Sequence, residues 1–283
     1  MPSRQVATGP IGVFDSGIGG LSVLAALRQE LPQEHFVYIG DAGHAPYGER
    51  DTAHVLHRSQ VLADYLCTTH QAKALVLACN TATAAAVASL RARYPMLPIV
   101  GIEPALKPAA AQSISGVVAV MATRSTLASD KFQALLSLQA PSVRFVLQAC
   151  DGLAAAIEQA DRQAIASLCQ RYVHALRQNP DGGAHIDTVV LGCTHYALIT
   201  GVLGPIWGPQ VKLLEAGPPV ARRTRQVLGA ADLLRSASKE TEQEALSAAT
   251  LYWSTGDPAL LNHALEDFLG AGPNVRANAL LLP

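Results

Sequence analysis

The chain has 283 residues, of which 49% are apolar and 15% are charged, and its formal net charge is −1. This length suits one large domain or two smaller ones with a substantial buried core. The absence of a basic excess argues against a nucleic-acid or membrane-surface partner. Five cysteines without a CxxC pair argue against a disulfide framework and against a structural zinc site.

The first residues, MPSRQVATG, are too polar for a signal peptide, and the longest apolar runs have the length of strands. We therefore expect a soluble, reduced, cytoplasmic protein.

Short apolar runs alternate with longer helical patterns along the chain. The predicted strands are Ile11–Phe14, His35–Ile39, Ala74–Ala78, Ile99–Ile102, Val117–Met121, Val143–Leu147, Thr188–Leu191 and Val211–Leu214. Predicted helices include Leu21–Leu31, Asp51–Thr69, Ala82–Tyr94, Asp151–Gln159 and Asp161–Arg177, and an exposed helix is predicted over Leu233–Ser247. This alternation predicts an α/β fold with doubly wound parallel sheets, in which ligands bind beyond the carboxyl ends of the strands.

Two stretches have the same layout. LVLACNTA (75–82) and VVLGCTHYA (189–197) each give an apolar strand, a small residue, a cysteine and a threonine-containing helix start. A weaker pair, IGVFDSGIGG (11–20) and VAVMATRST (118–126), precedes them at similar separations. Chance similarity of strand ends is the simple alternative. We predict two similar α/β domains related by a pseudo-twofold axis, with the active site in the crevice between them. The first comprises residues 1–103 and 214–283 and carries Cys79; the second comprises residues 104–213 and carries Cys193.

Cys79 and Cys193 each end a predicted strand just before a helix. The helix dipole and its free N–H groups favour a thiolate at such a position. A single cysteine there is more often a packing residue. Two at matching places would suit removal of a proton from one face of a carbon and delivery of a proton to the other.

The glycine-rich stretch DSGIGGLSVL (15–24) predicts a tight turn with exposed N–H groups, although it fits neither GxGxxG nor a GK[ST] loop. Asp15 and Ser16 offer a carboxylate and a hydroxyl, for a substrate ammonium group, for assisting a thiol, or simply for capping a helix. In GDAGHAPYGER (40–50), Tyr47 and Gly48 could donate hydrogen bonds to a carboxylate.

Neutral donors gather at other predicted helix starts and would together bind a small dianion. These residues are Asn80, Thr81, Thr123, Thr126 and Thr194. His195, two residues after Cys193, could assist that thiol, the alternative being an ordinary surface histidine. No lysine lies in an obvious pyridoxal-binding context and no metal-ligand spacing occurs, so we expect no cofactor.

Taken in order, DSGIGGL, GDAGHAPYGER, ACNTATA, GIEPA, ATRST and GCTHY resemble the glutamate racemases of the aspartate/glutamate racemase superfamily. The tail YWSTGDPALLNHALEDFLG (252–270) resembles the family's C-terminal segment, so the resemblance covers nearly the whole chain. It implies a cofactor-independent isomerase that interconverts L- and D-glutamate and supplies D-glutamate for peptidoglycan, and hence for cell-wall biogenesis and cell shape. It also implies a small-molecule substrate, a homodimer, and no membrane or nucleic-acid partner.

The resemblance assigns roles residue by residue. It makes Cys79 and Cys193 the acid/base pair, assisted by Asp15 and His195, with Asp41 and Glu158 in supporting roles. The substrate contacts that it implies are Asp15, Ser16, Tyr47, Gly48, Asn80, Thr81, Thr123, Thr194 and His195.

The chain departs from the family pattern at three places. CDGLAAAIE (150–158) stands where the family often has CPLxVPLIE, which leaves the role of Glu158 open. EAGPPVARR (215–223) replaces a segment usually resembling DSGE, and Met121 replaces a smaller residue. These changes could alter the domain hinge or the dimer contacts.

Three other functions compete with this interpretation. A superfamily relative could act on aspartate or a hydantoin. A thiol hydrolase with a Cys–His pair would leave the second cysteine unexplained. A non-catalytic amino-acid-binding protein would be expected to have lost a thiol, and both are present.

Overall fold

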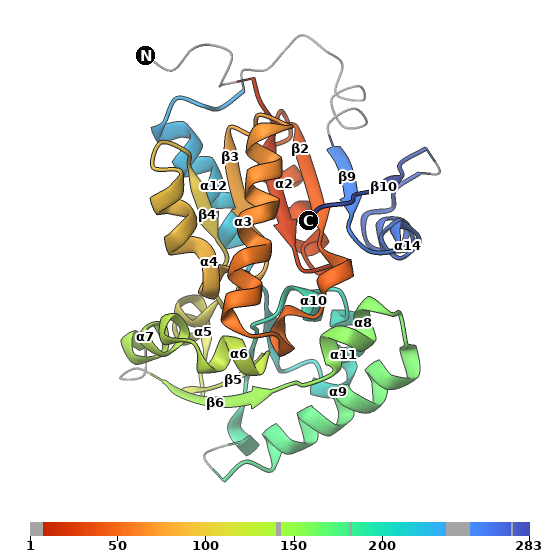
Figure 1. The fold of residues 1–283 in the computed structure, drawn as a ribbon. Coiled ribbons are helices and arrows are strands. Elements are labelled where there is room, and N and C mark those ends of the chain that lie inside the picture. Colours follow the sequence, from red (N-terminus) through yellow and green to blue (C-terminus); the bar gives the residue numbers. More distant parts are fainter. Residues whose placement is uncertain (1–7, 140–142, 181–182, 236–249, 273) are drawn as a thin grey trace. The chain divides into compact units, whose positions relative to one another are not determined.

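The computed structural model describes residues 8–139, 143–180, 183–235, 250–272 and 274–283. The chain divides into two compact units, one formed by Met1–Ile102 and Gly217–Pro283 and the other by Glu103–Ala216. In each unit the described strands form a parallel sheet with helices packed against it (Figure 1). The predicted fold class, α/β with two parallel-sheet domains, is confirmed. The predicted pseudo-twofold axis and crevice stay predictions.

The sheet of the first unit has the strand order β10-β9-β2-β1-β3-β4, with every neighbouring pair parallel. Its strands are β1 (Ile11–Asp15), β2 (Phe36–Gly40), β3 (Ala74–Leu77), β4 (Ile99–Gly101), β9 (Thr250–Ser254) and β10 (Ala277–Ala279). β1, β2 and β3 are buried along their whole length, as expected for strands covered on both faces. Their carboxyl ends therefore meet at one edge of the sheet.

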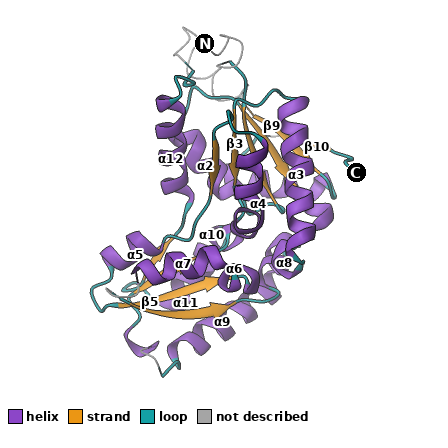
Figure 2. Cartoon of the chain, turned by 60° about the vertical axis from the view of Figure 1, so that its left-hand side comes forward, coloured by secondary structure: helices purple, strands orange, loops and turns teal. Residues whose placement is uncertain are grey.

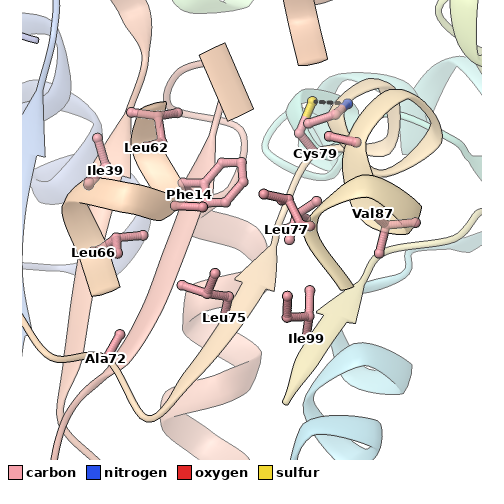
Figure 3. Packing of buried hydrophobic residues seen from close by; sticks show 14 of the residues in the cluster. Phe14, Ile39, Leu62, Leu66, Ala72, Leu75, Leu77, Cys79, Val87 and Ile99 are labelled. Atoms are coloured by element: carbon pink, nitrogen blue, oxygen red, sulfur yellow. Dashed lines mark hydrogen bonds between the residues drawn. The ribbon is translucent and has the colours of Figure 1, made fainter. Parts of the chain in front are cut away.

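Helices cover both faces of this sheet (Figure 2). They are α2 (Leu21–Glu30), α3 (Thr52–Thr68), α4 (Asn80–Arg93), α12 (Gly217–Ala230) and α14 (Pro258–Leu269), with single 3-10 turns η1 (Ala42–His44) and η2 (Tyr47–Glu49). Alternate strand residues such as Phe14, Leu75 and Leu77 point toward α3 and α4, where they join Leu62 and Leu66 in one cluster (Figure 3). Burying each such side chain contributes about 1.5–3 kcal/mol, which holds the strand ends in place.

The sheet of the second unit has the order β6-β5-β7-β8, again all parallel. Its strands are β5 (Val117–Ala122), β6 (Arg144–Ala149), β7 (Thr188–Leu191) and β8 (Lys212–Leu214). Its helices are α5 (Leu106–Gln112), α6 (Arg124–Ala128), α7 (Asp130–Gln139), α8 (Leu153–Glu158), α9 (Arg162–Arg177), α10 (Thr194–Ala197) and α11 (Thr200–Trp207), with the 3-10 turn η3 (Gly183–His185). Val118, Val120 and Val190 pack against Leu106 and Phe132 in its core.

All eight predicted strands are confirmed, with ends shifted by at most two residues, and the five predicted helices named above are confirmed as α2, α3, α4, α8 and α9. The strands β9 and β10 were not predicted. The predicted helix over Leu233–Ser247 lies mostly within 236–249, outside the described residues, and Leu233–Arg235 form no helix. Among the helices that the structure describes, none is long and apolar enough to cross a membrane.

Candidate active site

The residues singled out from the sequence fall into two groups, one in each unit. In the first unit, Asp15 ends β1, Tyr47 lies in the loop after β2, and Cys79 follows β3. In the second unit, Thr123 follows β5 and Cys193 follows β7. Each group lies beyond the carboxyl ends of its central strands, which is where parallel α/β sheets bind ligands. Whether the two groups meet at one substrate stays a prediction.

Cys79 is the N-cap residue of α4. Its backbone is still extended (φ −127°, ψ 124°), and the N–H of Ala82 donates a hydrogen bond to its Sγ at 3.5 Å (Figure 3). Figure 3 shows the residue at the margin of the cluster that contains Leu77, beyond the end of β3. The free N–H groups and the positive end of the helix dipole stabilise negative charge on a sulfur held there.

A chain of polar contacts links Cys79 to Asp15. Cys79 Sγ lies 3.9 Å from Ser16 Oγ, and the Ser16 hydroxyl lies 3.2 Å from Asp15 Oδ1. The backbone N–H of Ser16 also donates to Asp15 Oδ1, at 2.6 Å. Asp15 does not cap α2, because the N-cap residue of that helix is Gly20 and no side chain caps it. The capping alternative for Asp15 is therefore wrong.

Asn80 is the first residue of α4 and only 6% of its surface is exposed. Within the described part of the chain, neither its side-chain Nδ2 nor its Oδ1 has a hydrogen-bond partner. An unpaired buried amide costs about 1–3 kcal/mol, so a ligand that hydrogen-bonds to this amide would be favoured. Thr81 is buried beside it.

The loop after β2 holds Tyr47 and Gly48 in the turn η2. The Tyr47 hydroxyl donates to Asp41 Oδ2 at 2.5 Å. Burial, reinforced by the charge of Asp41, raises the pKa of Tyr47 far above its usual value, so this phenol is neutral. Since its one proton is already donated, Tyr47 can offer a ligand its backbone N–H, as can Gly48.

In the second unit, His195 connects Cys193 to Glu158. His195 Nδ1 lies 3.8 Å from Cys193 Sγ, and His195 Nε2 lies 2.7 Å from Glu158 Oε2. Burial alone would lower the pKa of His195, but its hydrogen bonds to Cys193 and Glu158 outweigh that effect and raise the pKa well above 6.5. His195 is 5% exposed, so the surface-histidine alternative is wrong. The arrangement places an imidazolium beside the thiol.

The remaining donors of the second unit lie at helix starts. Thr123 caps α6, its Oγ1 accepting a hydrogen bond from the Thr126 N–H at 3.2 Å and donating one to Thr126 Oγ1 at 2.8 Å. Thr194 is buried at the first position of α10, directly after Cys193.

Of the other three cysteines, Cys67 lies within α3, Cys169 lies within α9 and Cys150 follows β6. Burial raises the pKa of Cys67 and of Cys169 to about 11, and it raises the pKa of Cys150 further. The Cys150 thiol also donates to the carbonyl of Gln148 at 3.6 Å. These three remain neutral thiols at physiological pH; Cys150 and Cys169 are buried, and Cys67 is partly buried against the core of the first unit.

Sequence reasoning missed two residues that the structure connects to Tyr47. Arg58 on α3 and Thr255 after β9 both donate hydrogen bonds to Asp41. Asp41 had only a supporting role in the prediction. The sequence does contain a signal for Arg58, because this charged residue lies on the same helix face as Val55 and Leu62, which are buried in the core.

Residues 11–218 match the Asp/Glu/Hydantoin racemase family. The chain belongs to this family. It is accordingly an isomerase, an amino-acid racemase. A curated relative from Ectopseudomonas mendocina, named glutamate racemase, is 47% identical over 92% of this chain and 95% of its own.

Among solved structures, the glutamate racemase isoform RacE1 from Bacillus anthracis is 28% identical, with a TM-score of 0.82 over 97% of this chain and 98% of its own. Escherichia coli glutamate racemase, solved with L-glutamate and the activator UDP-MurNAc-Ala, is 26% identical, with a TM-score of 0.81 over 97% of this chain and 99% of its own.

Proposed function

We propose that this racemase interconverts L- and D-glutamate without a cofactor, by proton transfer between Cα and two thiols. The observation that carries the proposal is the matched setting of Cys79 and Cys193. Each follows a central parallel strand, each is the N-cap residue of the next helix, and each unit holds one. The name of the 47%-identical relative supports glutamate as the substrate.

In the proposed reaction, one cysteine as thiolate takes the proton from Cα of one enantiomer. The other cysteine, as a thiol, donates a proton to the opposite face of the same carbon. No atom is gained or lost by the substrate overall, and each thiol ends in the protonation state that the reverse reaction needs. Which thiol deprotonates which enantiomer stays open.

The two thiols have different neighbours. Cys79 contacts a neutral hydroxyl that leads to Asp15, whereas Cys193 faces the imidazolium of His195. A positive charge stabilises a negatively charged sulfur beside it. His195, held by Glu158, would thus stabilise Cys193 whenever it acts as the base.

We propose that the substrate's carboxylates are bound by neutral donors. In the first unit these are the buried amide of Asn80, the Thr81 hydroxyl and the N–H groups of Tyr47 and Gly48. In the second unit the contact residues that we propose are Thr123 and Thr194, together with the positively charged ring of His195. Asp15 and Ser16 complete the predicted contacts, on the side of Cys79.

We also propose that the D-glutamate enters peptidoglycan synthesis in the cytoplasm. The Escherichia coli relative with its muramic-acid nucleotide activator supports this role. The homodimer and the lack of a nucleic-acid partner are proposed from the resemblance and the near-neutral charge.

Circular dichroism of the purified protein with L-glutamate, D-glutamate and the two aspartate enantiomers tests the proposal. We expect the optical signal of either glutamate enantiomer to decay to zero with no cofactor added. Decay with aspartate alone would favour the other substrate of the family, and no decay with any of the four would refute racemisation of these amino acids.

A further inference from the structure

A buried ion pair lies behind the loop that carries Tyr47. The carboxylate of Asp41 is fully buried, and Arg58 donates to it through Nε at 3.1 Å and through Nη2 at 3.0 Å. Thr255 donates to the same carboxylate at 2.7 Å, as does Tyr47 at 2.5 Å. Asp41 thus accepts hydrogen bonds from residues of three elements of the first unit: α3, the loop after β9 and the turn η2.

The two-pronged contact of Arg58 fixes the plane of the Asp41 carboxylate. Parallel N–H donors on a guanidinium match the two oxygens of a carboxylate and define its orientation, which a lysine ammonium cannot do. With Oδ2 fixed in this way, the Tyr47 hydroxyl has one defined acceptor. The Tyr47 ring, 1% exposed, is therefore anchored at both its apolar face and its polar end.

Arg58 has a third contact, with the C-terminal segment Leu280–Pro283. Its Nη1 donates a hydrogen bond to the Pro283 carbonyl. Contacts other than the one with Arg58 also hold this segment in place. The Leu280 N–H donates to the Ser254 carbonyl at 2.8 Å, and the Leu280 side chain is buried in the same cluster as Tyr47. Arg58 therefore joins the C-terminal segment to the Tyr47 loop.

We propose that Arg58 is a positioning residue for substrate binding, holding Asp41 and through it Tyr47, so that the N–H groups of Tyr47 and Gly48 are presented to a substrate carboxylate. This inference rests on the proposed function, because it takes the loop after β2 as a substrate contact. Arg58 touches no reacting atom in this account and acts on the affinity for substrate.

The test compares three single variants, Arg58→Lys, Arg58→Met and Tyr47→Phe, with the double variant that combines Arg58→Met and Tyr47→Phe. We expect Arg58→Met to raise KM for both glutamate enantiomers by about 10-fold or more, because loss of one charge-assisted hydrogen bond weakens binding by about that much. The value of kcat should change by less than about 3-fold. Arg58→Lys should recover part of the loss, and Tyr47→Phe should add little to Arg58→Met. Unchanged KM in Arg58→Met, or effects that multiply fully in the double variant, would overturn the inference.

A matched control is Lys73→Met, which breaks another buried ion pair in the first unit. Lys73 Nζ lies 2.6 Å from Glu34 Oε2. Lys73 directly precedes β3, and Glu34 lies just before β2. This variant should lower the melting temperature without raising KM. A rise in KM equal to that of Arg58→Met would mean that general destabilisation explains both, which overturns the inference.

Hydrogen–deuterium exchange of residues 42–50 gives a readout that needs no activity. In the ligand-free protein, the loop should exchange faster in Arg58→Met than in the parent or in Lys73→Met. Unchanged exchange would refute the positioning role whatever the enzyme acts on. A parent protein that leaves glutamate unchanged but shows the expected exchange pattern would refute only the proposed function.

Discussion

The imidazole of His195 lies between a thiol and a carboxylate, with Nε2 2.7 Å from Glu158 Oε2 and Nδ1 3.8 Å from Cys193 Sγ. Glu158 ends α8, so the altered sequence CDGLAAAIE still delivers the carboxylate to the histidine. The contact gives Glu158 a definite part in the account, which is to hold the histidine charged and oriented.

Replacing Glu158 by Gln should lower the pKa of His195, because the amide cannot compensate the imidazolium charge in a buried setting. We expect the pKa to fall back toward the ordinary value of a histidine. The measurement is an NMR titration of the His195 ring nitrogens. Asp267→Asn, beside the exposed His263, is a control that changes a carboxylate to an amide without touching His195. An unmoved His195 titration in Glu158→Gln would contradict the role assigned to Glu158.

The same raised pKa predicts a pH dependence of folding stability. A group with a higher pKa in the folded state contributes stability that is full below its unfolded value, near 6.5, and is lost as the pH rises through the folded value. The parent should therefore lose free energy of unfolding above about pH 6.5 relative to Glu158→Gln. Denaturant titrations of both proteins from pH 6 to 9 measure this difference, and parallel curves would count against it.

Gly40→Ala should disturb the turn that carries Asp15 and Ser16. A Cβ at Gly40 would lie 2.9 Å from the carbonyl oxygen of Gly17, which is backbone and cannot rotate away. We expect a loss of about 1–3 kcal/mol in the free energy of unfolding, with reduced activity. Gly201→Ala is the control, because nothing lies within 4 Å of its Cβ and alanine favours a helix by up to about 1 kcal/mol. Equal stability of the two variants would show that the close approach is unimportant.

The hydrogen bonds to Asp187 predict a pH-dependent contribution to the stability of the second unit. Burial would raise its pKa, but hydrogen bonds from the N–H groups of Ser115 and Ile114 and from the Ser113 hydroxyl lower it from 3.8 to about 2. A lowered folded-state pKa contributes stability above the unfolded value, and this is lost as the pH falls from about 4 to about 2.

Asp187→Asn should therefore cost about 1–2 kcal/mol at pH 7, a figure reduced for the partial exposure of the carboxylate. Its difference from the parent should shrink in acid, as measured by denaturant unfolding at pH 7 and pH 3. A difference that stays constant with pH would refute the assignment.

Much of the fold could be predicted because apolar runs and helix starts are local signals. The eight strands of the prediction are short apolar runs with clear boundaries, and Cys79 and Cys193 lie where a strand pattern gives way to a helix pattern. β9 was missed because Leu251 is half exposed and the strand lies at the far end of the sequence from its partner β2.

The contacts around the site could not be read from the sequence, because they join residues far apart in the chain. Arg58 meets Asp41 and the carbonyl of Pro283, which is 225 positions away, and no local pattern records that pairing. Likewise the link from Glu158 to His195 spans 37 positions and depends on how α8 packs against α10.

The central claim is that two thiols act on opposite faces of one carbon, and deuterium incorporation in D₂O tests it most directly. Starting from either glutamate enantiomer, early product should carry deuterium at Cα while recovered substrate keeps its original hydrogen. Cys79→Ala and Cys193→Ala should each lower racemisation by about 10²–10⁴-fold or more. Equal deuterium in substrate and product from the first turnovers, or parent-like racemisation by either variant, would contradict the two-thiol account.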